Sequence, residues 1–478
     1  MKRIFVFLIL LSYNIKAQPN AVLRPVNLDS TLHENIILAL NYLEQTQRKS
    51  TKAGVYYKGE WQTYMNLNRS FFLLGKKRNV DDSNCFSVAS IHNILAKIYL
   101  SSPEYKTIPA MLDLSFERIM AYKTNNKFSF WNLLPPNRKL LKTDIVGQQP
   151  MVRRPTNYTL KSKYINNAAN VVEDADDTAL GYTAMALHQK ANHTSIDSFK
   201  LNLMFVTSIF DKYRDLNRKN RHWYNYMFGN DHNTGAYLTW LDDEYEFKHW
   251  NIVKVIGHNA TFYLPFSECF PHPYKPYLPY GSNDLDGVVN ANVLNALSYF
   301  DLSNAEGFAS TVKYIERKCK QKKFTRVAIY YPNIYQFPYS VANAFSNGIP
   351  QLKTSTDYIL QFILDNQNKD GSWSSRWVVN KRDKLQSTVY AVNALIKIGN
   401  FEENKSKESI EKAIHYILEN TINDGNGVHW KGGVFFSGGT VIRNYLFWKS
   451  DAYTTSIVID SFVNYSKYLQ QSNKNYTN

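Results

Sequence analysis

The sequence predicts an all-α fold, an (α/α)6 toroid in which six outer helices surround six inner helices. Two observations lead to this prediction. Apolar residues recur at helical spacing along most of the chain, and amphipathic segments alternate strictly with segments rich in small residues. Small residues allow helices to crowd around one axis, whereas an amphipathic helix keeps one face for solvent. We therefore expect a single toroid domain over residues 18–478.

The outer helices are expected where charged and apolar residues alternate at helical spacing. In the first of them Ile36, Leu40 and Leu43 share one face, and Thr31 with Glu34 forms a capping-box pattern. The six expected outer segments are 32–47, 108–122, 196–215, 308–320, 354–366 and 408–420.

The inner helices are expected in segments that begin with acidic or polar residues and continue with small ones. All inner helices of such a ring run in the same direction, so their N-termini meet at one mouth. A single Asp at a helix start is most often a cap, because it accepts hydrogen bonds from unpaired backbone N–H groups. The six expected inner segments are 83–99, 176–188, 284–300, 339–346, 385–398 and 451–468.

Two long inserts depart from the simple ring. Residues 123–170 carry nine Lys or Arg against one acidic residue, and residues 216–282 are crowded with aromatic side chains. Loops of this length in a compact fold are usually functional. Within the second insert, residues 234–241 alternate in polarity and are expected to form a strand of a small hairpin.

The N-terminus has the pattern of a secretory signal peptide. Lys2 and Arg3 precede a short apolar run, and Ala17 before Gln18 offers a cleavage site. We expect removal of residues 1–17, export to the periplasm or the medium, and no transmembrane segment. The net charge of +16 favours anionic small molecules, lipids or peripheral membrane contact as partners, and no nucleic-acid motif is present.

The three cysteines are too few for a disulfide framework and are expected to be free and buried. Cys85 lies near Asp82 and His92, but no other segment offers a second pair with the spacing of a zinc site. We therefore expect no metal site.

A dense acidic cluster begins the second inner helix. Glu173, Asp174, Asp176 and Asp177 place four carboxylates within five residues. Like charges this close cannot all ionise at low cost, and a carboxyl that stays protonated beside an apolar chamber is a proton donor. One helix needs only one cap, so the cluster exceeds what capping requires.

Two segments carry a family resemblance. Asp174-Ala175-Asp176-Asp177 resembles the DxDD motif of class II terpene cyclases, the family that includes squalene–hopene cyclase. The segment from Gln367 to Trp373 resembles the QW repeat, which ties neighbouring outer helices together in that superfamily. Residues 427–439 loosely resemble the Gly- and aromatic-rich segment near the end of those barrels.

The resemblance implies an isomerase that cyclises a polyprenyl substrate by protonating a terminal alkene or epoxide. Asp176 matches the Asp that donates the proton, and Asp174 and Asp177 would keep it protonated and oriented. The resulting carbocation needs an aromatic wall. No cofactor is implied, except Mg²⁺ with a diphosphate substrate, which the basic insert would hold. The candidate wall residues are Tyr182, Trp131 and Trp223.

Two other functions stay open from the sequence. An exported, aromatic-rich toroid also suits a glycoside hydrolase, with Asp176 and Asp286 as its two carboxylates, or a polysaccharide lyase. A non-catalytic toroid that binds an anionic ligand or a partner is the third interpretation. Asn290 and Asn292 lie inside an expected helix, where Asn is disfavoured, so each is expected to line the cavity or to brace a loop. The lyase candidates are His222, Tyr224, Asn225, His258 and Asn259.

Overall fold

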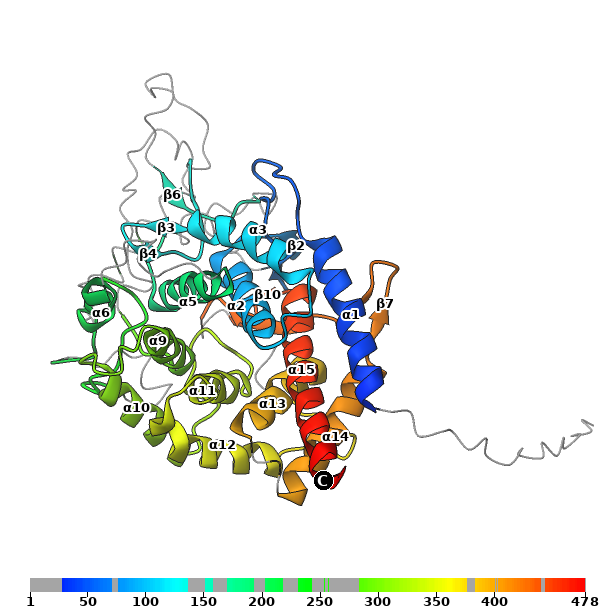
Figure 1. The fold of residues 1–478 in the computed structure, drawn as a ribbon. Helices are drawn as coiled ribbons and strands as arrows, with labels where there is room; N and C mark the ends of the chain where they lie inside the picture. The colour runs from blue at the N-terminus through cyan, green and yellow to red at the C-terminus, as the bar shows by residue number, and fades with distance from the viewer. Residues whose placement is uncertain are drawn as a thin grey trace, which may run out of the picture.

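Two concentric sets of helices surround a common axis, as Figure 1 shows. The computed structural model describes residues 28–70, 76–135, 151–157, 170–192, 203–217, 231–242, 253, 257, 283–375, 383–399, 401, 403–439 and 443–477. Within these ranges no helix combines the length and the apolar character needed to cross a membrane. The predicted (α/α)6 toroid is confirmed.

The inner helices are buried almost all round. In α5, every residue from Ala175 to Ala179 and from Gly181 to Leu187 is buried. Gly181 shows why small residues are needed, because a Cβ atom there would lie 2.7 Å from the ring of Phe128. The inner helices are α2 (Cys85–Ser101), α5 (Ala175–Ala191), α9 (Gly287–Tyr299), α11 (Gln336–Ser346), α13 (Lys384–Ile398) and α15 (Asp451–Thr477).

The outer helices bury one stripe each. In α14, Ile410, Ala413, Ile414 and Ile417 face the core at helical spacing, and the charged residues between them face solvent. A 3₁₀ turn, Pro350–Leu352, leads into α12. The outer helices are α1 (Leu28–Thr46), α3 (Ile108–Met120), α6 (Leu203–Asp211), α10 (Phe308–Lys320), α12 (Lys353–Asp365) and α14 (Asn404–Glu419).

The ring closes between the two ends of the chain. Each inner helix packs against the next one in sequence, and α15 packs against α2 to complete the circle. The first outer helix, α1, also packs against α15. The toroid therefore depends on both ends of the described chain.

A small antiparallel sheet, which the sequence analysis did not predict, covers the N-termini of the inner helices. Its strand order is β2-β1-β10-β9, and it pairs residues from the two ends of the chain, such as Met65 with Trp448. The strands have four residues each, too few for a clear alternating pattern. They are β1 (Tyr64–Leu67), β2 (Arg78–Asp81), β9 (Val434–Ser437) and β10 (Leu446–Lys449).

Three two-stranded ribbons complete the β structure: β3 (Lys123–Thr124) with β4 (Lys127–Phe128), β5 (Leu133–Leu134) with β6 (Val152–Arg153), and β7 (Ile422–Asn423) with β8 (Val428–His429). The tight turn of the first has two residues in the left-handed region, Asn125 and Asn126.

The segment 234–241 differs from its predicted hairpin. It is extended, but its described pairings are single bridges of Tyr237 with Arg214 and of Trp240 with Asp174. The segment thus connects the second insert to α5 instead of pairing within the insert.

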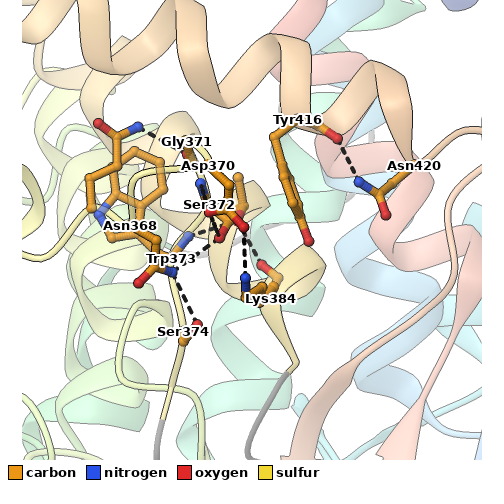
Figure 2. Close-up of polar contacts among 11 residues, drawn as sticks. Asn368, Asp370, Gly371, Ser372, Trp373, Ser374, Lys384, Tyr416 and Asn420 are labelled. Atoms are coloured by element: carbon orange, nitrogen blue, oxygen red, sulfur yellow. Dashed lines mark hydrogen bonds and ion pairs between the residues drawn. The ribbon is translucent and has the colours of Figure 1, made fainter.

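The QW-like segment ties three helices together. The Gln367 amide donates to the carbonyl oxygens of Gly371 (2.9 Å) and of Ser409 in α14 (2.8 Å). The Trp373 indole donates to the carbonyl oxygen of Ile363 in α12 (2.8 Å), and its backbone N–H donates to Thr388 of α13. Figure 2 shows this loop, which an ion pair of Lys384 with Asp370 also braces.

A second tie with the same hydrogen bonds joins α1 to α3. The Gln47 amide donates to the carbonyl oxygens of Gly59 (3.1 Å) and of Met111 in α3 (2.9 Å). The Trp61 indole donates to the carbonyl oxygen of Leu43 (2.7 Å), four residues before the Gln, as in the first tie. The sequence hides this repeat because the loop between Gln47 and Gly59 is longer.

The geometry of the tie recurs around the ring with other residues. In five places a residue in the left-handed region stands two positions before a buried aromatic side chain: Gly59 and Trp61, Asn126 and Phe128, Gly235 and Tyr237, Lys322 and Phe324, and Gly371 and Trp373. The sixth has one extra residue, between Gly427 and Trp430.

The aromatic residue of the tie is often anchored to the next inner helix. The backbone N–H groups of Phe128, Trp373 and Trp430 donate to the hydroxyls of Thr178, Thr388 and Thr455. Tyr237 makes the equivalent bond to the Asn290 side chain (3.0 Å). The QW-like segment is therefore one of six structurally related ties among the described residues.

Replacing Gly371 with Ala should lower the free energy of unfolding by about 3 kcal/mol, because left-handed backbone strain and a clash act together. The new Cβ would lie 2.4 Å from the Lys412 carbonyl oxygen. Gly348 is the matched control, since it also has a positive φ but no atom within 4 Å of its Cβ position. Gly348→Ala should cost only about 1–2 kcal/mol in the same urea titration. Equal losses for the two variants would contradict the clash.

Candidate active site

The four carboxyl groups at the start of α5 have different partners. Glu173 forms an ion pair with Arg153. Asp174 is the N-cap, and its carboxylate accepts the backbone N–H of Asp177 at 2.7 Å. Because the cap is provided by Asp174, the side chains of Asp176 and Asp177 are used elsewhere.

Asp176 lies buried where α5 meets α9 and the loop before α11. One carboxyl oxygen accepts the Asn292 amide at 2.7 Å, and the other hydrogen-bonds to the Tyr331 hydroxyl. Burial raises its pKa well above the ordinary value, and the charges of Asp174 and Asp286 add to this rise, whereas the Asn292 bond opposes it. The site therefore favours the protonated acid.

Asp177 faces α2 and not α9. Burial, together with Asp174 and Asp176, raises the pKa of Asp177 well above its usual range, and the Cys85 thiol donates to its carboxyl group. Burial raises the pKa of Cys85 as well, so this thiol stays neutral. Both groups are therefore favoured in their protonated, neutral forms.

An aromatic cluster surrounds the Tyr331 side of the acid. The Phe86 ring lies 5.7 Å from that of Tyr331, 6.0 Å from that of Phe436 and 6.0 Å from that of Tyr453. The faces of such rings stabilise positive charge. These four residues come from α2, from the loop before α11, from β9 and from α15.

A cavity lies on the axis of the ring, next to this cluster. Its volume is about 50 Å³, which holds about three or four water molecules. Phe86, Tyr339 and Tyr453 line it towards the sheet, and Asn292 connects it to Asp176. Its other end is polar, with Lys97, Asn343 and Asp460.

The four-stranded sheet is locked over the mouth by a buried carboxylate. Asp82 accepts the indole N–H of Trp448 (2.8 Å) and that of Trp131 (3.1 Å), which lie on β10 and beside the sheet. Burial raises the pKa of Asp82 to about 7, although these hydrogen bonds act in the opposite direction. The mouth therefore ends in a second protonatable group.

Three residues that were predicted to contact the substrate form hydrogen bonds within the fold. The Tyr182 hydroxyl donates to the Asn126 carbonyl oxygen at 2.8 Å, in the β3–β4 turn. Asp286 caps α9 and also accepts the backbone N–H groups of Ile329 (2.6 Å) and Tyr330 (3.1 Å). Neither residue lines the axial cavity. Trp131, as described above, holds the sheet through Asp82.

The remaining predicted contacts have different outcomes. Asn290 braces the second insert, because its amide bonds both the N–H and the carbonyl of Tyr237. Asn292, two residues later, lines the cavity and holds Asp176, so each of the two expected roles for a mid-helix Asn is present. Trp223 lies outside the described residues, as do His222, Tyr224, Asn225, His258 and Asn259.

Sequence reasoning missed Tyr331 and Phe86. Both residues are buried, and neither stands in a motif, so only their place in the ring brings them to the acid. The sequence offered one signal, the pair Tyr330-Tyr331. This pair lies between an outer helix, α10, and an inner helix, α11, and the loops at the equivalent places lead to the mouth of the ring.

Among the described residues, no group of three or more His, Cys, Asp or Glu side chains is arranged to hold a metal ion. Cys85 and Cys319 are free and buried, as expected. Cys269 lies outside the described residues.

The chain matches no protein-family model and no curated protein. Its fold resembles that of a variant of the type II terpene cyclase MstE from Scytonema in complex with the substrate geranylgeranyl dihydroxybenzoate. The TM-score is 0.53 at 13% identity, over 92% of this chain and 98% of that chain. Apo MstE gives a TM-score of 0.51 at 13% identity, over 91% and 98% of the two chains.

A protein from Actinoplanes gives a TM-score of 0.50 at 11% identity, over 91% of this chain and 99% of that chain. At such identities the likeness shows the fold. The predicted resemblance to the class II terpene cyclase toroid is confirmed, and the reaction stays a prediction.

The free energy of unfolding should fall as the pH rises from about 5 to about 7. The pKa of Asp82 is raised to about 7 and that of Asp286 to about 6, so in this window the folded state holds protons that the unfolded state has lost. Each such carboxyl changes stability by at most about 1.4 kcal/mol per pH unit. Urea titrations across the window measure this slope.

Asp82→Asn should flatten that slope, because the substituted amide does not titrate. Asp370→Asn is the control, since the exposed Asp370 has its pKa lowered to about 2 by hydrogen bonds from Lys384 and Ser372. An unchanged slope in Asp82→Asn would show that this carboxyl does not titrate in the window.

Proposed function

We propose that the chain is an acid-initiated cyclase that resembles class II terpene cyclases and acts on an isoprenoid substrate. The observation that carries the proposal is the environment of Asp176. Its carboxyl group is buried, does not cap its helix, and hydrogen-bonds to Asn292 and Tyr331 beside an aromatic cluster. A carboxyl group that only capped the start of its helix would be placed like that of Asp174.

In this reaction the Asp176 carboxyl gives its proton to a terminal alkene or epoxide of the substrate. A neighbouring double bond of the same molecule then attacks the cationic carbon, and a ring closes. Asn292 and Tyr331 stabilise the carboxylate that remains, because both can donate to its oxygens. The faces of Phe86 and Phe436 are suited to the positive charge. Loss of a proton ends the sequence, so the net change is an isomerisation.

The size of the cavity sets a condition on substrate entry. About 50 Å³ accepts a few heavy atoms and not a whole isoprenoid chain. A longer substrate must therefore displace aromatic side chains of the mouth. Phe436 belongs to β9 and packs against Phe86, which lines the cavity, so movement of the sheet would widen the aromatic end of the cavity.

The hydrolase interpretation is less well supported. It requires a second free carboxylate opposite Asp176, but the Asp286 carboxylate accepts four backbone N–H groups, those of Val288, Val289, Ile329 and Tyr330. This carboxylate connects the start of α9 to residues 329 and 330, and its oxygens are not available to act as a base or a nucleophile. A non-catalytic toroid that binds a ligand remains the alternative. An assay for turnover distinguishes it from the cyclase, because a binding protein converts no substrate.

Asp176→Asn should lower kcat/KM for cyclisation at least about 100-fold, because the amide cannot donate the proton. The assay offers squalene, oxidosqualene, geranylgeraniol and geranylgeranyl diphosphate to the purified chain and analyses products by mass spectrometry. Asp370→Asn, on the outer surface, is the control and should match the wild type. Failure of the wild type on every substrate, or equal activity of Asp176→Asn, would reject the cyclase.

Activity should fall as the pH rises through the raised pKa of Asp176, because the donor must be protonated. Asn292→Ala should move this alkaline limb to higher pH, since the Asn292 bond lowers the pKa of Asp176. Asn295→Ala is the matched variant, as it alters the same cavity one turn further along α9. A pH–rate profile that does not move in Asn292→Ala would argue against Asp176 as the titrating acid.

A further inference from the structure

The end of the axial cavity away from Asp176 has its own polar lining. Lys97 lies near the C-terminal end of α2 and Asn343 near that of α11, whereas Phe86 and Tyr453 lie at the opposite helix ends. Lys97 lies eleven positions after Phe86 in α2, which corresponds to about 16 Å along the axis. The cavity thus has an aromatic end, which Asn292 connects to Asp176, and a polar end, which is lined by Lys97, Asn343 and Asp460.

Lys97 brings a positive charge to this end. Its ammonium donates to the Asn343 side-chain oxygen at 3.0 Å and lies 5.6 Å from the centre of the Tyr299 ring. Burial lowers the pKa of Lys97 to about 8, which leaves it mainly charged at neutral pH, and the negative charge of Asp460 opposes this shift.

Asp460 is the one carboxylate among the residues that line the cavity, and its oxygens already have strong partners. It accepts from Lys397 (2.9 Å), Asn393 (3.0 Å) and Asn464 (2.8 Å). Burial alone would raise the pKa of Asp460, but Lys397, Asn393 and Lys97 lower it. Two lysines thus share one carboxylate, and this end of the cavity keeps a net positive charge.

Four oxygen atoms around the same cavity have no hydrogen-bond partner among the described residues. They belong to Asn93, Thr183, Asn295 and Gln336, which are 2–6% exposed. The Asn93 amide nitrogen donates to the Leu180 carbonyl at 3.1 Å, so its oxygen is the atom left over. A buried polar atom without a partner costs about 1–3 kcal/mol. Four unpaired acceptor oxygens around one small cavity indicate a site that binds a molecule with hydrogen-bond donors.

We propose that this end of the cavity binds the anionic, hydroxyl-bearing head group of the substrate, an inference that rests on the proposed cyclase function. The carboxylate of a hydroxy acid would face Lys97, and its hydroxyl would donate to the amide oxygen of Asn93, one turn before Lys97 in α2, or to that of Asn295. A simple carboxylate would leave those oxygens unpaired, and a neutral polyol would leave the cation without a counter-ion. With the head group held here, the hydrocarbon chain extends towards the aromatic rings and Asp176.

The test measures binding by calorimetry on the full chain, with no turnover. The probes are glycolate, which has both groups, acetate, which has the charge alone, and ethylene glycol, which has the hydroxyls alone. Glycolate should bind at least about tenfold more tightly than either of the others. Equal binding of the three probes, or no binding of any, would overturn the proposal and leave ordered water as the occupant.

Variants separate the two recognition elements. Lys97→Met should weaken glycolate at least about tenfold, whereas Lys190→Met, which also lies over the Tyr299 ring but does not line the cavity, should bind like the wild type. Asn295→Leu should remove the advantage of glycolate over acetate and leave acetate unchanged. Wild-type affinity for glycolate in Lys97→Met would overturn the proposal.

A longer probe separates a lipid head group from a free small acid. 2-Hydroxyoctanoate should bind more tightly than glycolate if the chain continues towards the aromatic end, and equal or weaker binding would overturn the assignment to a substrate head group. Because Asp176→Asn should bind these probes normally, loss of turnover in that variant and loss of binding in Lys97→Met report on different claims.

Discussion

The crowding of six parallel inner helices around one axis is the constraint on which the rest of this structure depends. Because these helices are buried on every side, little water reaches the polar groups at their ends. The Asp residues that begin them are therefore desolvated together, and burial is the first cause of the raised pKa of Asp82, Asp174, Asp176 and Asp286. The same packing that forms the toroid thus produces its acids.

A recurring structural motif holds neighbouring outer helices of the ring at a fixed spacing. A residue in the left-handed conformation followed by a buried aromatic provides it at all six positions, and a hydroxyl or amide of the next inner helix receives the aromatic residue's N–H at four of them. At these four positions the aromatic residue contributes its backbone N–H, so its side chain can change without loss of this bond. This explains why the sequence resembles the QW pattern in only one segment.

The axis of the toroid is chemically polarised. One end has aromatic faces and is connected through Asn292 to Asp176, and the other has a lysine, amides and a paired carboxylate. Buried polar atoms without partners lower stability, and proteins keep them mainly where function uses them. The inner surface therefore has the features of a site for a molecule with one polar and one hydrocarbon end, and the sheet over the mouth separates that site from solvent.

The sequence alone determined the order and type of the twelve helices, because helical periodicity and small-residue content are local properties. It left open whether the acidic cluster at Asp174 to Asp177 caps the helix or acts as a proton donor, and the structure assigns the cap to Asp174. The sheet, the six ties, and the partners Asn292 and Tyr331 were decided by tertiary structure, because they join residues that are far apart in the chain. Asp286 and Asn290 show the same limit: a local pattern marks a buried polar residue, but only the surrounding backbone decides whether it faces a ligand or the fold itself.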